Sequence, residues 1–153
     1  MPIKRHYPEA PIVGVGAIVF DDAGRVLLAQ RGKPPRTGQW SIPGGMLELG
    51  EKLLDAVMRE VQEECSIEIA VGEVVLIYEP IFRDEEGKIE FHYVLVDYWA
   101  RHVSGEAVAN DDALAVAWVT LANLAEYRLS PDTANAILKA HEMWQKASGT
   151  VRQ

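Results

Sequence analysis

The first part of the chain alternates apolar runs with short polar turns, a pattern that is typical of strands joined by hairpins. Ile12–Phe20 is an apolar, β-branched run, and Arg25–Arg31 is a second run of strand character. The turn Asp21-Asp22-Ala23-Gly24 lies between them, so we predict that the two strands form a hairpin. Further strands are predicted at Val71–Glu79, Ile89–His102 and Ala115–Val119, the first two being joined by the polar turn Arg83–Lys88.

Two segments instead repeat their apolar residues at helical spacing. The first is Glu51–Cys65, with Leu53, Leu54, Val57 and Val61 on one side. The second runs from Pro131 to about Ala147, with Ser130 as its N-cap. Its apolar stripe is Ala134, Ile137, Leu138 and Trp144.

The stretch between the predicted hairpin and the first helix has no such periodicity. Lys33–Gln39 contains Pro34, Pro35 and Gly38 and is predicted to be a loop, and 40–45 to be a short extended piece ending in a flexible turn. Strands and helices therefore mix without regular β-α-β alternation. This favours an α/β fold in which a mixed sheet has helices on both faces.

Length and charge reduce the number of function classes that fit the chain. We expect 153 residues to form one domain, residues 1–153. The net charge of −8 argues against broad binding to a nucleic-acid backbone, which needs a basic face. No apolar run approaches the roughly 20 residues that cross a bilayer, and the N-terminus does not resemble a signal peptide. We therefore expect a cytoplasmic protein without membrane partners. Cys65, the single cysteine, is interpreted as a small buried hydrophobic residue and not as a nucleophile.

The first predicted helix has an unusual acidic face. Glu60, Glu63 and Glu64 lie three and four residues apart, so their carboxylates share one side. Like charges at this spacing are destabilising, and the helix C-terminus also disfavours anions. A solvated acidic surface is one interpretation. The other is a Mg²⁺ site, because hard carboxylate oxygens suit this ion and the cation would let an acidic protein hold a phosphate anion.

Residues on either side of this face support the second interpretation. Gly44 and Gly45 permit a close backbone approach and offer carbonyl ligands. We place Glu51 in the first turn of the helix, where an anion is favoured. Arg59 is expected to reach Glu63 at i, i+4 and to orient it, or to form an ordinary helix ion pair with it.

These residues resemble the Nudix box, GX5EX7REUXEEXGU. Gly45, Glu51 and the run Arg59-Glu60-Val61-Gln62-Glu63-Glu64-Cys65-Ser66-Ile67 match eight of its nine fixed positions. Ser66 stands where the family has Gly. The motif covers 45–67, and the order of strands and helices over nearly the whole chain is similar to a Nudix domain.

The resemblance implies an α/β/α sandwich and a MutT-like hydrolase that cleaves the diphosphate bond of a nucleoside diphosphate linked to another group. It implies metal ligation by the Gly45 carbonyl, Glu60, Glu63 and Glu64, with Mg²⁺ as the cofactor and Mn²⁺ as a substitute. Glu63 and Glu64 are then the catalytic carboxylates. Arg59 and Glu51 correspond to residues that hold the loop–helix–loop in shape.

The sequence does not identify which residue is the general base. In the family it is either a motif glutamate or an acid on a later loop, here Asp111 or Asp112, which read equally well as a polar turn. Glu85 and Glu86 are weaker alternatives.

The sequence gives few indications of which residues contact the substrate. Arg31 and Arg83 are expected to contact phosphate, whereas Arg36 is interpreted as a surface arginine. Trp40, Tyr78, Phe82 and Tyr93 are either base-stacking or core aromatics.

The segment 105–118 is similar to small bacterial Nudix proteins that act on ADP-ribose or nucleotide sugars, which is the favoured substrate class. The alternatives are a nucleoside triphosphate pyrophosphohydrolase that removes damaged nucleotides and a non-catalytic nucleotide-sensing module. A homodimer formed through the Trp144 helix and the edge strands is a further hypothesis.

Overall fold

The computed structural model describes residues 3–34 and 36–152, with side chains described up to residue 148. Its elements, in chain order, are β1 (Ile12–Phe20), β2 (Val26–Arg31), β3 (Trp40–Ser41), β4 (Gly44–Met46), α1 (Leu53–Cys65), β5 (Glu68–Tyr78), β6 (Ile81–Arg83), β7 (Ile89–Ser104), β8 (Ala113–Val119), the 3-10 helix η1 (Leu121–Tyr127) and α2 (Pro131–Arg152).

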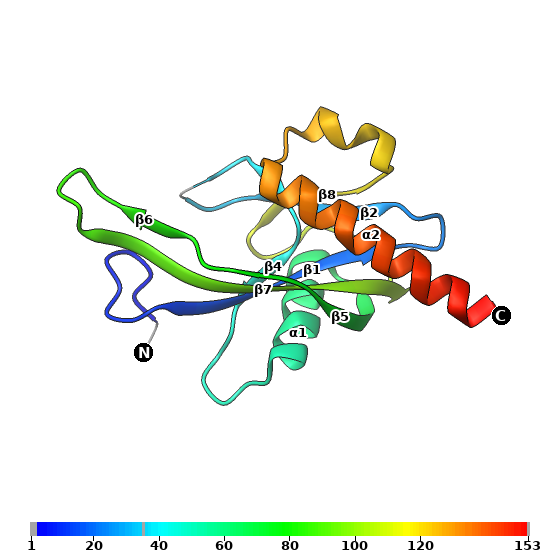
Figure 1. Ribbon diagram of the computed structural model, residues 1–153, viewed down its shortest axis with the longest axis horizontal. Coiled ribbons are helices and arrows are strands. Elements are labelled where there is room, and N and C mark those ends of the chain that lie inside the picture. Colours follow the sequence, from blue (N-terminus) through cyan, green and yellow to red (C-terminus); the bar gives the residue numbers. More distant parts are fainter. Residues whose placement is uncertain (1–2, 35, 153) are drawn as a thin grey trace.

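All eight strands belong to one mixed sheet. Its main order is β3-β2-β1-β7-β5, while β4 pairs with β1, β6 with β7 and β8 with β2. The long pairing of β1 with β7 is parallel, and the others are antiparallel. Figure 1 shows α1 and α2 on opposite sides of this sheet. The predicted sandwich is confirmed.

The alternation of side chains along β1 builds both cores. Val15, Ala17 and Val19 face α1 and pack with Val57 and Val61. Ile18 and Phe20 face the other way, toward α2. Because successive strand residues point to opposite faces, one fully buried apolar strand supports a helix on each side.

The predicted start of the first helix is wrong. α1 begins at Leu53 after an N-cap at Lys52, so Glu51 lies outside it. Gly50 adopts a φ of 83°, and the Glu51 N–H donates to the Glu48 carbonyl at 3.0 Å. This turn fixes the entry to the helix.

Two residues of the predicted apolar stripes do not lie in the core. Leu54 is 47% exposed and Leu138 is 51% exposed. On α1, Ala56 and Cys65 take the buried positions, and on α2 Ala136 and Ala140 do so. Small residues let each helix approach the sheet closely, and this displaces the buried face away from the larger leucines.

Element boundaries differ in several places. β5 begins at Glu68, ahead of the predicted Val71, and α2 continues to Arg152. Arg83, predicted to open a polar turn, ends the short strand β6. Ser130 does cap α2, because its Oγ accepts the Thr133 N–H at 3.2 Å.

The hairpin of β6 and β7 projects beyond the rest of the sheet (Figure 1). The N-terminal segment packs along it. Tyr7 donates its hydroxyl to Asp84 at 2.7 Å, and His6 lies 2.8 Å from Glu90.

Candidate functional site

The centre of the site is the close approach of α1 to β4. Gly45 has no side chain, and a Cβ built on it would collide with the Glu60 carboxylate. One turn further along α1, the Glu64 carboxylate lies near the Gly44 backbone, which lowers its pKa. Both strand positions therefore require glycine, Gly45 because Glu60 occupies its side-chain space and Gly44 because the β1 backbone does.

Arg59 connects the helix to the turn in front of it. Its guanidinium donates to both oxygens of Glu51, at 2.7 and 2.9 Å, and to the Met46 carbonyl at 3.0 Å. It also donates to Glu60 at 2.8 Å and to Glu63 at 3.3 Å. The predicted i, i+4 pair with Glu63 therefore exists, but the shorter bonds are those to Glu51 and Glu60.

These bonds have a clear electrostatic signature. The hydrogen bonds from Arg59 hold the pKa of Glu51 down at about 2, against the opposing effect of burial. Glu60 receives the same help, yet burial outweighs it and raises the Glu60 pKa. Burial raises the pKa of Glu64 to about 8, with the nearby Glu60 charge adding to it.

The segment that follows β7 is fastened to the end of α1. The backbone N–H groups of Val108 and Asn110 donate to the carbonyls of Cys65 and Glu64, at 3.0 and 2.9 Å. The Ser66 hydroxyl also donates to the Val108 carbonyl at 3.2 Å. Carbonyls at a helix end lack intrahelical partners, so this segment completes the helix while lying over the acidic face.

The two aspartates of this segment lie next to the motif glutamates. The charge of Asp111 raises the pKa of Glu60, and that of Asp112 raises the pKa of Glu64. Asp112 is also paired with Lys33 at 2.9 Å. The polar-turn interpretation is therefore incomplete, because the turn brings both carboxylates to the site.

The donor set fits a divalent cation. Within the described residues, no three His, Cys, Asp or Glu side chains converge closely enough to make a ready-formed metal site. Yet Glu60 and Glu64 are both partly buried, and burial followed by the Glu60 charge raises the pKa of Glu64, so its charged form has a deficit of favourable partners. A hard divalent cation between these oxygens and the Gly45 carbonyl would relieve that deficit.

The two predicted phosphate-binding arginines differ in position. Arg31 is exposed at the end of β2 and lowers the pKa of Glu64, so it lies beside the glutamates. Arg83 lies on the projecting hairpin and donates to the Gly87 carbonyl at 3.1 Å. The fold does not bring Arg83 to the motif, and a phosphate contact there stays a prediction.

The aromatic candidates divide in a similar way. Trp40 packs edge-on against Tyr127 at 5.0 Å, within the α2-side core. Tyr93 stacks on Phe91. Phe82 is 40% exposed and lies under the Arg36 guanidinium at 5.6 Å. Arg36, interpreted from sequence as an ordinary surface residue, therefore has an aromatic partner.

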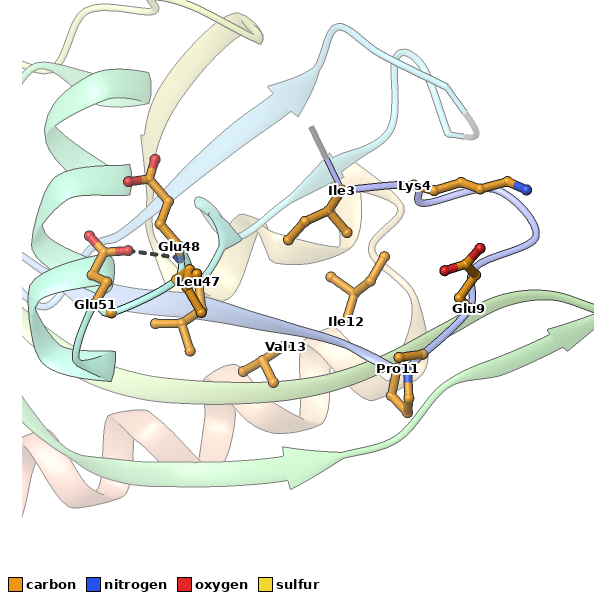
Figure 2. Close-up of a pocket in the computed structure, with 12 residues that line it drawn as sticks. Ile3, Lys4, Glu9, Pro11, Ile12, Val13, Leu47, Glu48 and Glu51 are labelled. Atoms are coloured by element: carbon orange, nitrogen blue, oxygen red, sulfur yellow. Dashed lines mark hydrogen bonds between the residues drawn. The ribbon is translucent and has the colours of Figure 1, made fainter. Parts of the chain in front are cut away.

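A cavity of about 480 Å³ lies on the other side of the α1 entry turn. Figure 2 shows it between the N-terminal segment, with Ile3 and Lys4, and the turn carrying Leu47 and Glu48. Glu51 is at its margin, bonded to the Glu48 N–H at 3.1 Å. None of the three motif glutamates lines this cavity.

Comparison with known proteins decides the family. The model of the NUDIX domain matches residues 10–140. This chain belongs to the Nudix family. It is accordingly a Nudix pyrophosphohydrolase, and hydrolases of this family generally use divalent cations. No helix in the described part of this Nudix protein has the length and apolar character to span a membrane.

Similar sequences have several activities. An ADP-ribose pyrophosphatase from Methanocaldococcus jannaschii is 30% identical, over 88% of this chain and 75% of that protein. A CTP pyrophosphohydrolase from Escherichia coli is 31% identical, over 78% and 84% respectively.

Solved structures agree in fold. The NUDIX domain of Shewanella oneidensis NrtR, in complex with ADP ribose, aligns with a TM-score of 0.71 at 26% identity, covering 89% of this chain and 90% of that domain. A MutT NUDIX hydrolase from Burkholderia pseudomallei aligns with a TM-score of 0.66 at 33% identity, covering 86% and 98%.

Proposed function

We propose that this Nudix hydrolase cleaves the diphosphate bond of ADP-ribose or a similar nucleotide sugar, with Mg²⁺ as its cofactor. The observation that carries the proposal is the partial burial of Glu60 and Glu64, with Glu60 packed against Gly45. Two repelling carboxylates in a partly desolvated position destabilise the protein unless a cation joins them.

Each motif residue then has a defined task. Glu60, Glu63, Glu64 and the Gly45 carbonyl are the proposed metal ligands. Arg59 positions Glu60 and Glu63 through the bonds described above, and Glu51 fixes Arg59 in turn. The proposal assigns Arg31, which is exposed at the end of β2, to a phosphate oxygen of the substrate. Bound Mg²⁺ would neutralise the diphosphate and lower the pKa of a coordinated water.

The attacking water must lose a proton to a nearby carboxylate. Glu64 and Asp112 are both available, since their charges interact across the same space. Asp112 is paired with Lys33 at 2.9 Å, whereas the described residues give Glu64 no side-chain ion pair within 4.0 Å. Comparing Glu64→Gln with Asp112→Asn in their effects on kcat and on metal affinity distinguishes the two, because a base that is not a ligand changes only kcat.

Support for the substrate class comes from the relatives. The Methanocaldococcus relative is named for ADP-ribose, and the Shewanella domain binds it. The Escherichia coli CTP pyrophosphohydrolase favours a second candidate, hydrolysis of a nucleoside triphosphate. Retention of all three motif glutamates favours either activity over a non-catalytic nucleotide sensor.

A substrate screen with Mg²⁺ tests the proposal. ADP-ribose, nucleotide sugars, dinucleoside polyphosphates and normal and oxidised nucleoside triphosphates would be compared, with Glu63→Gln and Glu64→Gln as inactive controls. We expect AMP from ADP-ribose. Release of pyrophosphate from a triphosphate as the faster reaction would favour the second candidate, and wild-type rates in both variants would remove the metal site from its proposed position.

A homodimer stays part of the proposal in a modified form. Trp144 packs against Phe20 at 5.4 Å and so belongs to the core of the monomer. The edge formed by β5 and β6 instead exposes Val74, Ile77 and Ile81. Light scattering of the wild type and of an Ile77→Lys variant tests whether this edge mediates association.

A further inference from the structure

Asp97, on β7, is a buried carboxylate that the motif chemistry does not use. It is 6% exposed, the one charged side chain in the buried set of the described residues. Within the same residues its carboxylate has no hydrogen-bond or ion-pair partner. Burial alone raises its pKa to about 6. An unpaired buried carboxylate costs free energy, so the fold by itself would be better served by an apolar residue.

The residual exposure of Asp97 lies at its carboxylate. Among the described side chains, the unpartnered polar atoms that are fully enclosed are Trp99 Nε1 and Arg101 Nε. The oxygens of Asp97 are not in that group although they too lack a partner. The Asp97 carboxylate is therefore not completely enclosed.

Strand pairing connects Asp97 to the proposed metal site. Gly16 on β1 pairs with Asp97 on one side and with Gly44 on the other. Neighbouring strands lie ≈4.8 Å apart, which places Asp97 and Gly44 about 10 Å from one another. The sugar and base of a nucleotide span this distance from a diphosphate held at Gly44 and Gly45.

Only Gly16 lies between Asp97 and Gly44 in this row of paired residues. Gly16 has no side chain, and the Asp97 carboxylate lies over it together with Ile42. In the described structure β4 pairs only with β1, so its outer edge is unpaired. Gly16 alternates with Val15 and Ala17, which face α1, so Asp97 lies on the α2 face of the sheet. A substrate held by α1 reaches Asp97 by passing around this outer edge of β4.

Tyr78, whose ring is suited to a planar base, lies near the same position. The charges of Asp97, Asp132 and Arg36 all act on the Tyr78 hydroxyl, whose pKa is raised to about 12 mainly by burial. Arg36 also covers the Phe82 ring. The Tyr78 ring offers a stacking surface, and Asp97 offers a hydrogen-bond acceptor. Phe82 pairs with Phe91, six residues before Asp97 on β7, and is not part of this position.

We propose that Asp97 determines substrate specificity by accepting a hydrogen bond from the exocyclic amino group of the nucleobase. This inference rests on the proposed function, since it takes the diphosphate to lie at the motif glutamates. It assigns amino-bearing bases, adenine or cytosine, as the preferred class over their carbonyl counterparts, hypoxanthine or uracil. A site that pairs a substrate N–H rejects the analogue lacking it, because the acceptor is then left buried and unpaired.

The test compares matched substrates that differ in this group alone: ADP-ribose with IDP-ribose, and a CDP-sugar with the corresponding UDP-sugar. Wild type, Asp97→Asn, Asp97→Leu and the control Asp22→Asn, an exposed turn residue, would be assayed for kcat and KM. We expect wild type to prefer the amino member at least tenfold in kcat/KM. Asp97→Asn should reverse the preference, because an amide can donate to a carbonyl, while Asp97→Leu should abolish it.

Asp97→Leu should also melt at a higher temperature than wild type, since it removes an unpaired carboxylate. Unchanged preferences in Asp97→Asn and Asp97→Leu, with both enzymes active, would overturn the proposal. If wild type hydrolyses none of the four compounds, the proposed function fails on its own. Binding of the same pairs, measured by calorimetry, then decides the Asp97 assignment, which is lost if wild type does not bind the amino member more tightly.

Discussion

Arg59 and Glu51 are joined by two hydrogen bonds, from Nε to Oε2 at 2.7 Å and from Nη2 to Oε1 at 2.9 Å. This bidentate pair links the middle of α1 to the turn that precedes it. Glu51 lies outside the helix, so the pair does not stabilise the helix itself. It fixes how the helix, and with it Glu60 and Glu63, is oriented toward β4.

We predict that Arg59→Lys lowers kcat by about 100-fold, because a lysine cannot form the bidentate pair and the ligands shift. Steady-state kinetics with saturating Mg²⁺ measures this. Arg25→Lys, at the exposed pair with Asp21, is the matched control and should keep wild-type rates. Equal rates in the two variants would show that Arg59 does not position the glutamates.

The same pair predicts acid sensitivity. The folded-state pKa of Glu51 is about 2, below its ordinary value of 4.5. The stability that this carboxylate contributes is therefore present above about pH 4.5 and is lost as the pH falls toward 2. Urea unfolding across this range should show a smaller loss in Glu51→Gln than in wild type. Parallel curves for the two proteins would contradict the assignment.

The raised pKa of Glu64 predicts that metal binding releases a proton. In the metal-free protein its pKa is raised to about 8, so at pH 7 it is mostly protonated. A cation that binds its carboxylate must displace this proton, and affinity should rise as the pH approaches 8. Calorimetry of Mg²⁺ or Mn²⁺ binding, in two buffers of different ionisation enthalpy, should give nearly one proton released. Glu64→Gln should release none, and a wild-type value near zero would be incompatible with this position as a ligand.

Ser66 provides a stability test. It adopts the left-handed conformation, with φ 65° and ψ 24°, at the position where the family motif has Gly. Relief of about 1 kcal/mol of strain in Ser66→Gly is partly offset by loss of the hydroxyl bond to Val108. We expect a small rise in Tm and nearly unchanged turnover. A large change in turnover would mean that Ser66 contributes to the chemistry.

Cys65 should be inert in the native protein. It is fully buried, and burial raises the pKa of its thiol to about 12. Because the thiolate is the reactive form, iodoacetamide at pH 8 should label it only after unfolding. Mass spectrometry with and without urea checks this. Rapid labelling of folded protein, with loss of activity, would reopen the possibility of a functional thiol.

Local patterns predicted the framework of this fold well. Both alternating sets of positions in β1 are apolar, so the pattern predicts that the strand is buried on both faces. Ser130-Pro131 marks the start of α2. Leu54 and Leu138 were misassigned because helical spacing does not show which of two adjacent apolar stripes meets the sheet. Alanines at 56, 136 and 140 decide this through close packing.

The site was only partly predictable for a related reason. Spacing within one helix places Glu60, Glu63 and Glu64 on one face, and the Nudix motif adds Gly45, Glu51 and Arg59. Contacts between segments that lie far apart in the sequence leave no comparable pattern of residue spacing. The pairing of Lys33 with Asp112, and the row that joins Asp97 to Gly44 through Gly16, depend on strand register. Register follows from the whole sheet and cannot be read from any one strand.

The hydrogen bonds of Val108 and Asn110 to the last carbonyls of α1 have a consequence for sequence change. They hold the segment with Asp111 and Asp112 against the end of α1, although more than 40 positions separate the two along the chain. Insertions between Ser104 and Asp112 would pull the aspartates out of alignment with the glutamates. Insertions at the tip of the β6–β7 hairpin would leave that alignment intact, so variation in length is expected to accumulate there.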